Sequence, residues 1–118
     1  MEYIVIENHT TEFPNPIKLN QGEKVIIGEE SNENGNWPNW VLCKKLDGSN
    51  EGWVPKQILK YENDHGIILE DYSAKELNID EKTIVEGIKI LNGWLLSKNK
   101  ETNEIGWIPM EKLKKNIE

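Results

Sequence analysis

The sequence contains no arginine, only one cysteine and no long apolar run. A single cysteine excludes an internal disulfide. No stretch approaches the ~20 apolar residues that a membrane-spanning helix needs. The first four residues lack the basic segment, followed by an apolar one, that marks a signal peptide. We therefore expect a cytoplasmic protein that does not enter a membrane.

Acidic residues outnumber basic ones, with 21 aspartates and glutamates against 14 lysines and a net charge of −7. This sign disfavours binding to nucleic-acid phosphates and to anionic lipid surfaces. It is compatible with a protein partner that offers a basic or proline-rich segment, and also with a charge that only maintains solubility. We expect no nucleic-acid partner and a monomer. Abundant Lys, Asn and Ile without Arg hints at an AT-rich bacterial genome.

Recognisable catalytic and metal-binding motifs are also missing. There is no P-loop, no dinucleotide fingerprint and no Gly-x-Ser-x-Gly. Cys43, His9 and His65 are too scattered to form a zinc pattern, and the alternation of Cys43 with Val41 is typical of a buried residue. The sequence therefore predicts a non-enzymatic protein without cofactor or metal. The rival interpretation is an enzyme or a small-molecule binder with a pocket between the two halves of the chain.

Two tryptophans in each half of the chain share one spacing. The spacing from Trp40 to Trp53 is the same as the spacing from Trp94 to Trp107. One shift of the sequence along itself therefore superposes the two pairs. A self-match at a fixed period is the signature of a duplicated structural unit.

Upstream of the tryptophans, the two halves can be aligned in two ways. One alignment places Leu19 on Leu77, and the other places Ile17 on Leu77. The two alignments differ by an even number of positions. Both therefore keep the same faces of the strands inward, and the choice between them stays open.

The duplication predicts two small domains, at residues 1–61 and 67–118, joined by a short linker at 62–66. Domains of this size fold alone but are marginal, because a small body buries a smaller fraction of its surface. A linker this short cannot hold two domains far apart, so we expect them to touch.

Short apolar runs bounded by Asn, Gly, Asp or Pro predict β-strands throughout the chain. The runs lie near residues 4–6, 24–27, 40–43, 67–69, 83–85 and 94–96. Asn92-Gly93 between two apolar runs is a hairpin-turn signal. Residues 56–59 and 110–113 each allow a single helical turn after a proline. The pattern predicts an all-β protein made of small barrels or sandwiches.

Four segments recur in the same order in both halves. The second half reads Ile68-Leu69-Glu70-Asp71-Tyr72, Glu76-Leu77-Asn78-Ile79, Gly93-Trp94-Leu95 and Gly106-Trp107-Ile108-Pro109. The first half reads Val5-Ile6-Glu7-Asn8-His9, Ile17-Lys18-Leu19, Asn39-Trp40-Val41 and Gly52-Trp53-Val54-Pro55. This order resembles the Src-homology-3 (SH3) domain, in the variant form found in bacteria. The resemblance implies two tandem SH3-like β-barrels packed close together.

By this resemblance, each barrel binds an extended, proline-containing segment in a groove between two loops. Such a segment is already in the polyproline II conformation, so it loses little entropy on docking. By the resemblance, the groove of the second domain is formed by Tyr72, Trp94 and Pro109. Asp71 and Glu76 would hold a basic residue of the ligand. The groove of the first domain is formed by Trp40, Pro55 and Glu12, with His9 in place of a tyrosine.

Departures from the family pattern deplete both grooves. A second tyrosine, expected three residues after the proline, is replaced by Ile58 in the first domain and by Lys112 in the second. Binding of some other protein surface or segment therefore stays open beside peptide binding. Cell-wall peptide binding is a further alternative, although the Leu-Asn-Val-Arg-type motif of the SH3-like domains that bind cell walls is missing.

The tryptophans are expected to have different roles. Trp40 and Trp94 each precede an apolar residue in a strand, so if that residue faces the core, the tryptophan faces outward and can anchor a ligand. Trp37, in a long polar loop, is either a second anchor or a cap on the barrel. Trp53 and Trp107 are expected to pack on the barrel or between the domains. Burial of Trp40 and Trp94 would instead indicate a purely architectural pair.

Overall fold

The computed structural model describes residues 1–11, 13–32, 34–35 and 37–117. Within these residues the chain forms twelve strands and two short 3-10 helices and contains no α-helix, so the all-β prediction is confirmed. No described helix is long and apolar enough to cross a membrane. The elements are β1 (Glu2–Val5), β2 (Lys18–Leu19), β3 (Lys24–Glu30), β4 (Trp40–Lys45), β5 (Glu51–Pro55), η1 (Lys56–Ile58), β6 (Leu59–Glu62), β7 (His65–Ile68), β8 (Tyr72–Ser73), β9 (Ile84–Leu91), β10 (Trp94–Asn99), β11 (Ile105–Pro109), η2 (Met110–Lys112) and β12 (Leu113–Lys115).

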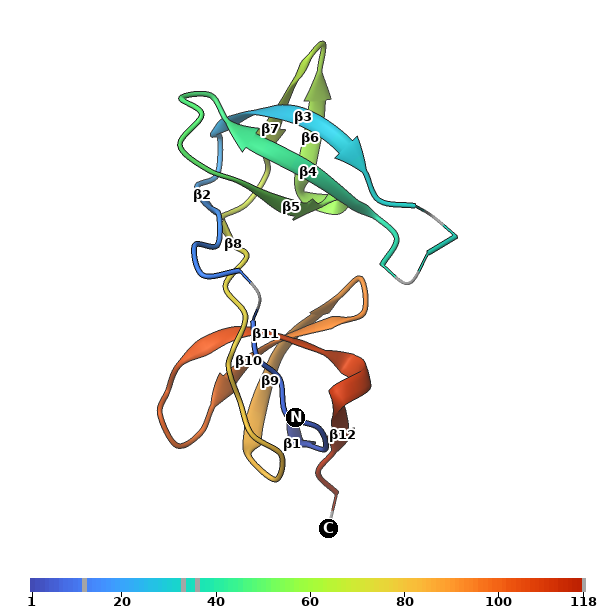
Figure 1. Ribbon diagram of the computed structural model, residues 1–118, viewed down its shortest axis with the longest axis vertical. Helices are drawn as coiled ribbons and strands as arrows, with labels where there is room; N and C mark the ends of the chain where they lie inside the picture. The colour runs from blue at the N-terminus through green and yellow to red at the C-terminus, as the bar shows by residue number, and fades with distance from the viewer. Residues whose placement is uncertain (12, 33, 36, 118) are drawn as a thin grey trace. The chain divides into compact units, whose positions relative to one another are not determined.

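The chain folds into two compact units that do not coincide with its two halves (Figure 1). Unit 1 combines Met1–Pro14 with Lys75–Glu118, and unit 2 is the continuous segment Asn15–Ala74. The chain therefore leaves unit 1 after Pro14 and returns to it after Ala74.

Each unit contains one five-stranded antiparallel sheet, and the two sheets have the same arrangement. The order is β11-β10-β9-β1-β12 in unit 1 and β5-β4-β3-β7-β6 in unit 2. Figure 1 shows β1 beside β12 in the first sheet and β7 beside β6 in the second. Strands β1 and β7 thus occupy equivalent positions. Unit 2 also holds the two-stranded sheet β2-β8, and the bridge between His9 and Ile79 takes the matching place in unit 1.

These boundaries differ from the predicted domains at residues 1–61 and 67–118. Strand β1, predicted to begin the first domain, pairs with β9 and β12. Strand β7, predicted to begin the second domain, pairs with β3 and β6. The predicted linker at 62–66 is instead the turn region of the β6–β7 hairpin. The hairpin is possible because Asn63 adopts the left-handed conformation, with φ 54°, that tight turns of this kind require.

The core lies on one face of each sheet, because buried and exposed side chains alternate along a strand. In β1, Tyr3 and Val5 are buried, whereas their neighbours are partly exposed. The core of unit 1 consists of Tyr3, Val5, Leu77, Ile79, Val85, Leu95, Ile108 and Leu113. The buried aliphatic residues of unit 2 are Ile17, Leu19, Val25, Val41, Val54, Ile58, Leu59 and Ile68. Full burial of one such side chain contributes about 1.5–3 kcal/mol, so these clusters dominate the stability of each unit.

The predicted turns are confirmed. Asn92 and Gly93 connect β9 to β10, with φ values of 50° and 86°. Positive φ at both central residues is the mark of a type I′ hairpin turn. Pro55 and Pro109 each precede one turn of 3-10 helix, since proline fixes φ near the value that such a turn needs.

Strand pairing also decides between the two alignments left open upstream of the tryptophans. Val25 lies opposite Gly66 of β7, and Val85 lies opposite Tyr3 of β1. Because β7 and β1 are equivalent, Val25 and Val85 are equivalent too. This equivalence selects the alignment that places Ile17 on Leu77.

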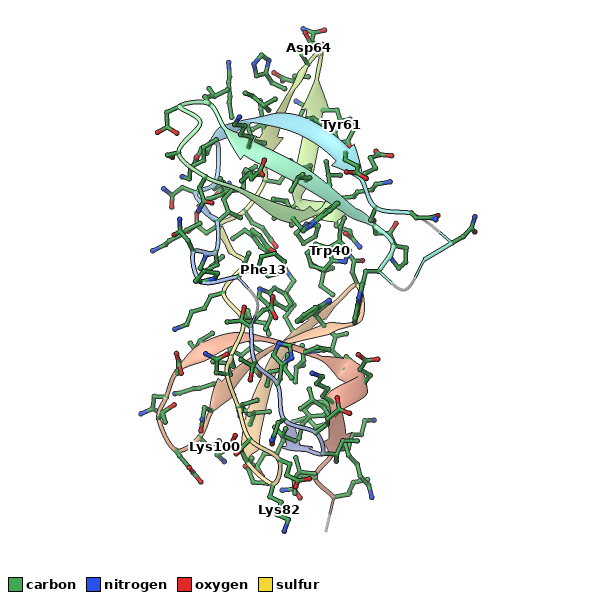
Figure 2. All side chains as sticks on the ribbon, viewed as in Figure 1. Phe13, Trp40, Tyr61, Asp64, Lys82 and Lys100 are labelled. Atoms are coloured by element: carbon green, nitrogen blue, oxygen red, sulfur yellow. The ribbon has the colours of Figure 1, made fainter. Side chains whose placement is uncertain are left out.

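Lys82 lies in the turn before β9 (Figure 2) and has a φ of 75°, where Gly22 of unit 2 has a φ of 86°. A residue other than glycine pays roughly 1–2 kcal/mol to adopt the left-handed backbone conformation, and glycine avoids this cost. Glycine also gives the unfolded chain more conformational entropy, which offsets about 0.5–1 kcal/mol of that stabilisation. We expect Lys82→Gly to raise the free energy of unfolding by about 0.5–1 kcal/mol, measured by urea denaturation. The control is Gly22→Ala, whose added Cβ meets nothing within 4 Å, and which should destabilise. A destabilised Lys82→Gly variant would contradict the strain.

Candidate functional site

His9 is carried into unit 1 by the segment that follows β1. Its backbone N–H donates to the Ile79 carbonyl and its carbonyl accepts from the Ile79 N–H, both over 2.9 Å. The side chain is buried, with 8% of the residue exposed. Buried polar side chains need hydrogen-bond partners, so the surroundings of this ring are informative.

Both ring nitrogens of His9 have polar neighbours. Nε2 lies 2.7 Å from Glu76 Oε1, and Nδ1 lies 3.1 Å from Lys112 Nζ. An ammonium only donates and an ionised carboxylate only accepts. The network therefore assigns the neutral tautomer in which Nε2–H donates to Glu76 and Nδ1 accepts from Lys112. The Lys112 ammonium also donates a hydrogen bond to the Asn8 carbonyl, over 3.3 Å.

Trp94, the first residue of β10, stands edge-on to the His9 ring. The two ring centroids are 5.9 Å apart and the planes meet at 79°, a T-shaped contact. Such edge-to-face contacts are a preferred geometry of aromatic rings. Trp94 is partly exposed and lies opposite Pro109 of β11, which is buried. The result is a partly exposed tryptophan whose ring contacts a histidine that has polar partners at both nitrogens.

The equivalent position in unit 2 is filled by Tyr72, which pairs with Leu19. The Tyr72 hydroxyl donates to the Trp53 carbonyl over 3.0 Å, and its ring is buried. Trp40 and Pro55, which lie opposite each other on β4 and β5, are buried too. The equivalents of His9 and Trp94 in this unit are therefore not exposed.

The burial of Trp40 corrects the expectation that it faces outward. Only 8% of it is exposed, although Val41 beside it is buried in the core of unit 2. Both faces of β4 are thus covered at this point, which strand alternation alone does not reveal. The indole Nε1 of Trp40 has no hydrogen-bond partner among the described residues.

The structure groups the predicted groove residues differently from the sequence prediction. His9 lies with Trp94, Pro109 and Glu76, whereas the prediction placed His9 with Trp40. Tyr72 lies in unit 2, whereas the prediction placed it with Trp94. The cause is that β1 belongs to the sheet of unit 1 and β7 to the sheet of unit 2, the reverse of the prediction. His9 follows β1 and Tyr72 follows β7, so each residue lies in the unit of its strand.

The acidic residues predicted to hold a basic ligand are also separated. Asp71 lies in unit 2 and accepts a hydrogen bond from the Gln21 N–H over 2.8 Å. Glu76 lies in unit 1 and is engaged by His9. Glu12, the third acidic candidate, lies outside the described residues.

The sequence pattern does not predict the contact between Lys112 and His9. The family pattern places a tyrosine at position 112, and the lysine reaches His9 in its place. Two coupled departures from the pattern, a histidine and a lysine in place of two tyrosines, were the signal that could have indicated the contact.

The remaining aromatic residues differ in exposure. Trp37 of unit 2 is 37% exposed and Phe13 of unit 1 is 55% exposed. Trp107 is buried and Trp53 is partly exposed, compatible with their expected packing role.

Cys43 of β4 is completely buried. Burial raises the pKa of its thiol to about 11, because an apolar interior disfavours the charged thiolate. A nucleophilic cysteine needs the opposite shift and a nearby base. Within the described residues, no three His, Cys, Asp or Glu side chains gather as metal ligands either.

Residues 3–62, half of the chain, match the family model described as the variant SH3 domain. The chain belongs to the variant SH3 family. No curated protein and no solved structure shows a significant match to the chain. SH3 domains are in general non-enzymatic protein-interaction modules. The matched variant SH3 segment begins with β1, which the structure pairs with strands beyond residue 62.

We expect Cys43 to resist alkylation in the folded protein. A thiol pKa of about 11 instead of 9.0 lowers the thiolate fraction at pH 8 by about 100-fold, and only the thiolate reacts. Iodoacetamide labelling followed by mass spectrometry should thus be at least about 100-fold slower in native buffer than in denaturant. Stability should also fall as the pH rises from about 9 to 11, because only the unfolded chain then loses this proton. Equal labelling rates in both conditions would refute the burial.

Proposed function

We propose that this protein is a non-enzymatic interaction module, made of two SH3-like units, that binds an extended proline-containing or basic segment of a protein partner. The observation that carries the proposal is the rigidly held, partly exposed Trp94 beside His9. The shared strand order of the two sheets supports the tandem arrangement. The protein would act in the cytoplasm, and its buried unpaired cysteine is compatible with a reducing compartment.

Trp94 has the properties of a binding anchor in unit 1. A large aromatic ring with a fixed orientation loses little conformational entropy when a ligand docks on it. His9 fixes that orientation through the edge-on contact, and Glu76 with Lys112 fixes His9. Tryptophans of this kind dominate the binding energy of many interfaces. A prolyl ring, rigid and apolar, is a suitable ligand for such a surface.

In unit 2 the better candidate anchor is Trp37 and not Trp40. Trp37 is 37% exposed and stands in the segment between β3 and β4, whereas Trp40 is buried. A ligand can reach Trp37 without any rearrangement of the sheet. If one partner engages both units, two weak contacts can reinforce each other through effective concentration.

The charge of the protein favours a basic segment over an acidic one. The net charge of −7 attracts cationic partners and speeds their encounter. Asp71 and Glu76, the two described carboxylates predicted for this role, already accept hydrogen bonds within their own units. We therefore infer a general electrostatic preference and not one specific ion pair.

The test is a titration with a synthetic peptide of about ten residues, rich in proline and ending in lysines. The indole N–H signals of the five tryptophans can be followed by nitrogen-15 NMR. We expect the Trp94 signal to shift, and Trp94→Ala to weaken binding at least roughly tenfold, or ~1.4 kcal/mol. The fold should remain intact in this variant, because the Trp94 side chain is not part of the core cluster.

Tyr61→Ala is the matched control. It removes a ring that is 50% exposed on β6 (Figure 2) and lies outside the proposed surface. This variant should bind the peptide like the wild type. Equal binding by Trp94→Ala and the wild type would exclude Trp94 as the anchor, and an absence of any indole shift at millimolar peptide would exclude this ligand class.

A further inference from the structure

Backbone geometry does not decide which sheet receives β1 and which receives β7. Val5 of β1 lies opposite Leu113, as Ile68 of β7 lies opposite Leu59. The residue after each of these strands donates its N–H to a carbonyl of a 3-10 helix, over 2.8 Å in both units. Either strand therefore presents the hydrogen-bond pattern that either sheet requires.

Side-chain size does distinguish the two positions. In unit 1, Tyr3 of β1 packs over Gly87 of β9, and a Cβ added at Gly87 would lie only 2.9 Å from Tyr3 Cε1. In unit 2 the sizes are reversed, because Ile27 of β3 packs over Gly66 of β7. A Cβ added at Gly66 would lie 2.8 Å from Ile27 Cδ1. Each contact thus joins one large side chain to one glycine.

The four residues occupy two pairs of equivalent positions. Tyr3 and Gly66 each lie opposite a valine of the neighbouring strand, and Gly87 and Ile27 each follow that valine by two residues. In a contiguous pairing, with β1 between β3 and β6, Tyr3 would meet Ile27 and the two large side chains would compete for one space. Gly66 would meet Gly87 and leave a gap. Overpacking and cavities both destabilise a core.

Charges at the start of β1 favour the same choice. Glu2 forms an ion pair with Lys100 and accepts a hydrogen bond from Asn116 Nδ2 over 3.4 Å. By the alignment that superposes the tryptophans, the two equivalent positions of unit 2 hold Leu46 and Glu62. In the exchanged sheet, Lys100 and the Met1 ammonium balance the cross-strand pair Glu2 and Glu86. Contiguous pairing would remove Lys100 from Glu2 and place the carboxylate of Glu2 beside that of Glu62, which is unfavourable across strands.

We propose that the exchange of β1 and β7 between the two sheets is encoded by these complementary sizes and charges, so that neither half of the sequence forms a complete barrel. The pair of units is then the smallest functional unit. The exchange brings His9, which follows β1, beside Trp94 of the other half. The consequence for ligand binding rests on the function proposed above, whereas the strand pairing is tested without any ligand.

NMR of the full chain tests the pairing through nuclear Overhauser effects (NOEs). The exchange predicts cross-peaks between the Tyr3 ring and Gly87 Hα, and between Gly66 Hα and the Ile27 δ1 methyl group. Isotope-filtered spectra of mixed labelled and unlabelled chains should show none of these contacts between chains. Cross-peaks from Tyr3 to Ile27 would overturn the proposal, and contacts between chains would overturn it as well, because the exchange would then join two copies.

A variant in which the large and small side chains at positions 27 and 87 are exchanged tests whether side-chain size selects the strand partner. In the double variant Ile27→Gly/Gly87→Ile, contiguous pairing restores one large side chain against one glycine in each sheet. We expect the Tyr3 ring contacts to move, in at least part of the molecules, from position 87 to position 27. A folded variant that keeps all its Tyr3 contacts at position 87 would show that size does not select the partner. An unfolded variant would also count against the proposal, because contiguous pairing removes the Tyr3 contact at position 87 and requires only a small shift of Leu95, whose Cδ1 lies 3.2 Å from a Cβ there.

Disulfide cross-linking provides a measurement that is independent of NMR. Glu2 and Glu86 are opposite each other in the exchanged sheet, and the equivalent of Glu86 in unit 2 is Ile26. In a Cys43→Ala background, Glu2→Cys/Glu86→Cys should form an intramolecular disulfide at least roughly ten times faster than the matched pair Glu2→Cys/Ile26→Cys, because cross-strand neighbours have the geometry a disulfide needs. Peptide mapping without reductant identifies the bond, and faster bonding in the Ile26→Cys pair would overturn the exchange.

Discussion

The fit of a single inserted strand is the constraint on which each sheet depends. Strand β1 separates β9 from β12, and β7 separates β3 from β6, so each sheet is divided in two without its inserted strand. Each inserted strand contributes an almost fully buried side chain to a core, Val5 from β1 and Ile68 from β7. In each sheet a glycine leaves space for a large side chain of the adjacent strand, Gly87 for Tyr3 and Gly66 for Ile27.

The candidate site is a direct consequence of this strand placement. His9 follows β1 and so lies beside Trp94, the first residue of β10. Its two ring nitrogens meet an anion and a cation, Glu76 and Lys112, and this polarised arrangement is compatible with a neutral imidazole in a buried place. The equivalent position in unit 2 holds Tyr72, whose hydroxyl donates to the Trp53 carbonyl. The repeated fold thus carries two different local chemistries.

Much of the fold could be predicted because its signals are local. Asn92-Gly93 specifies its own turn through two positive φ angles, and Pro55 and Pro109 specify the start of a helical turn. The candidate site was predicted only in part. Trp94 was assigned correctly to a partly exposed strand end, but its neighbour was expected to be Tyr72, because the sequence order of the family implies contiguous barrels.

The sequence by itself determined the strands, the turns and the SH3 type of fold, because these depend on the apolar pattern and on residues close together in the chain. Only the tertiary structure decided which strand enters which sheet. Strands β1 and β7 are equally long and form equivalent backbone pairings. The apolar periodicity of the sequence therefore does not distinguish them. The choice depends on the match of side-chain size between residues such as Tyr3 and Gly87, which are distant in sequence and meet only in the folded protein.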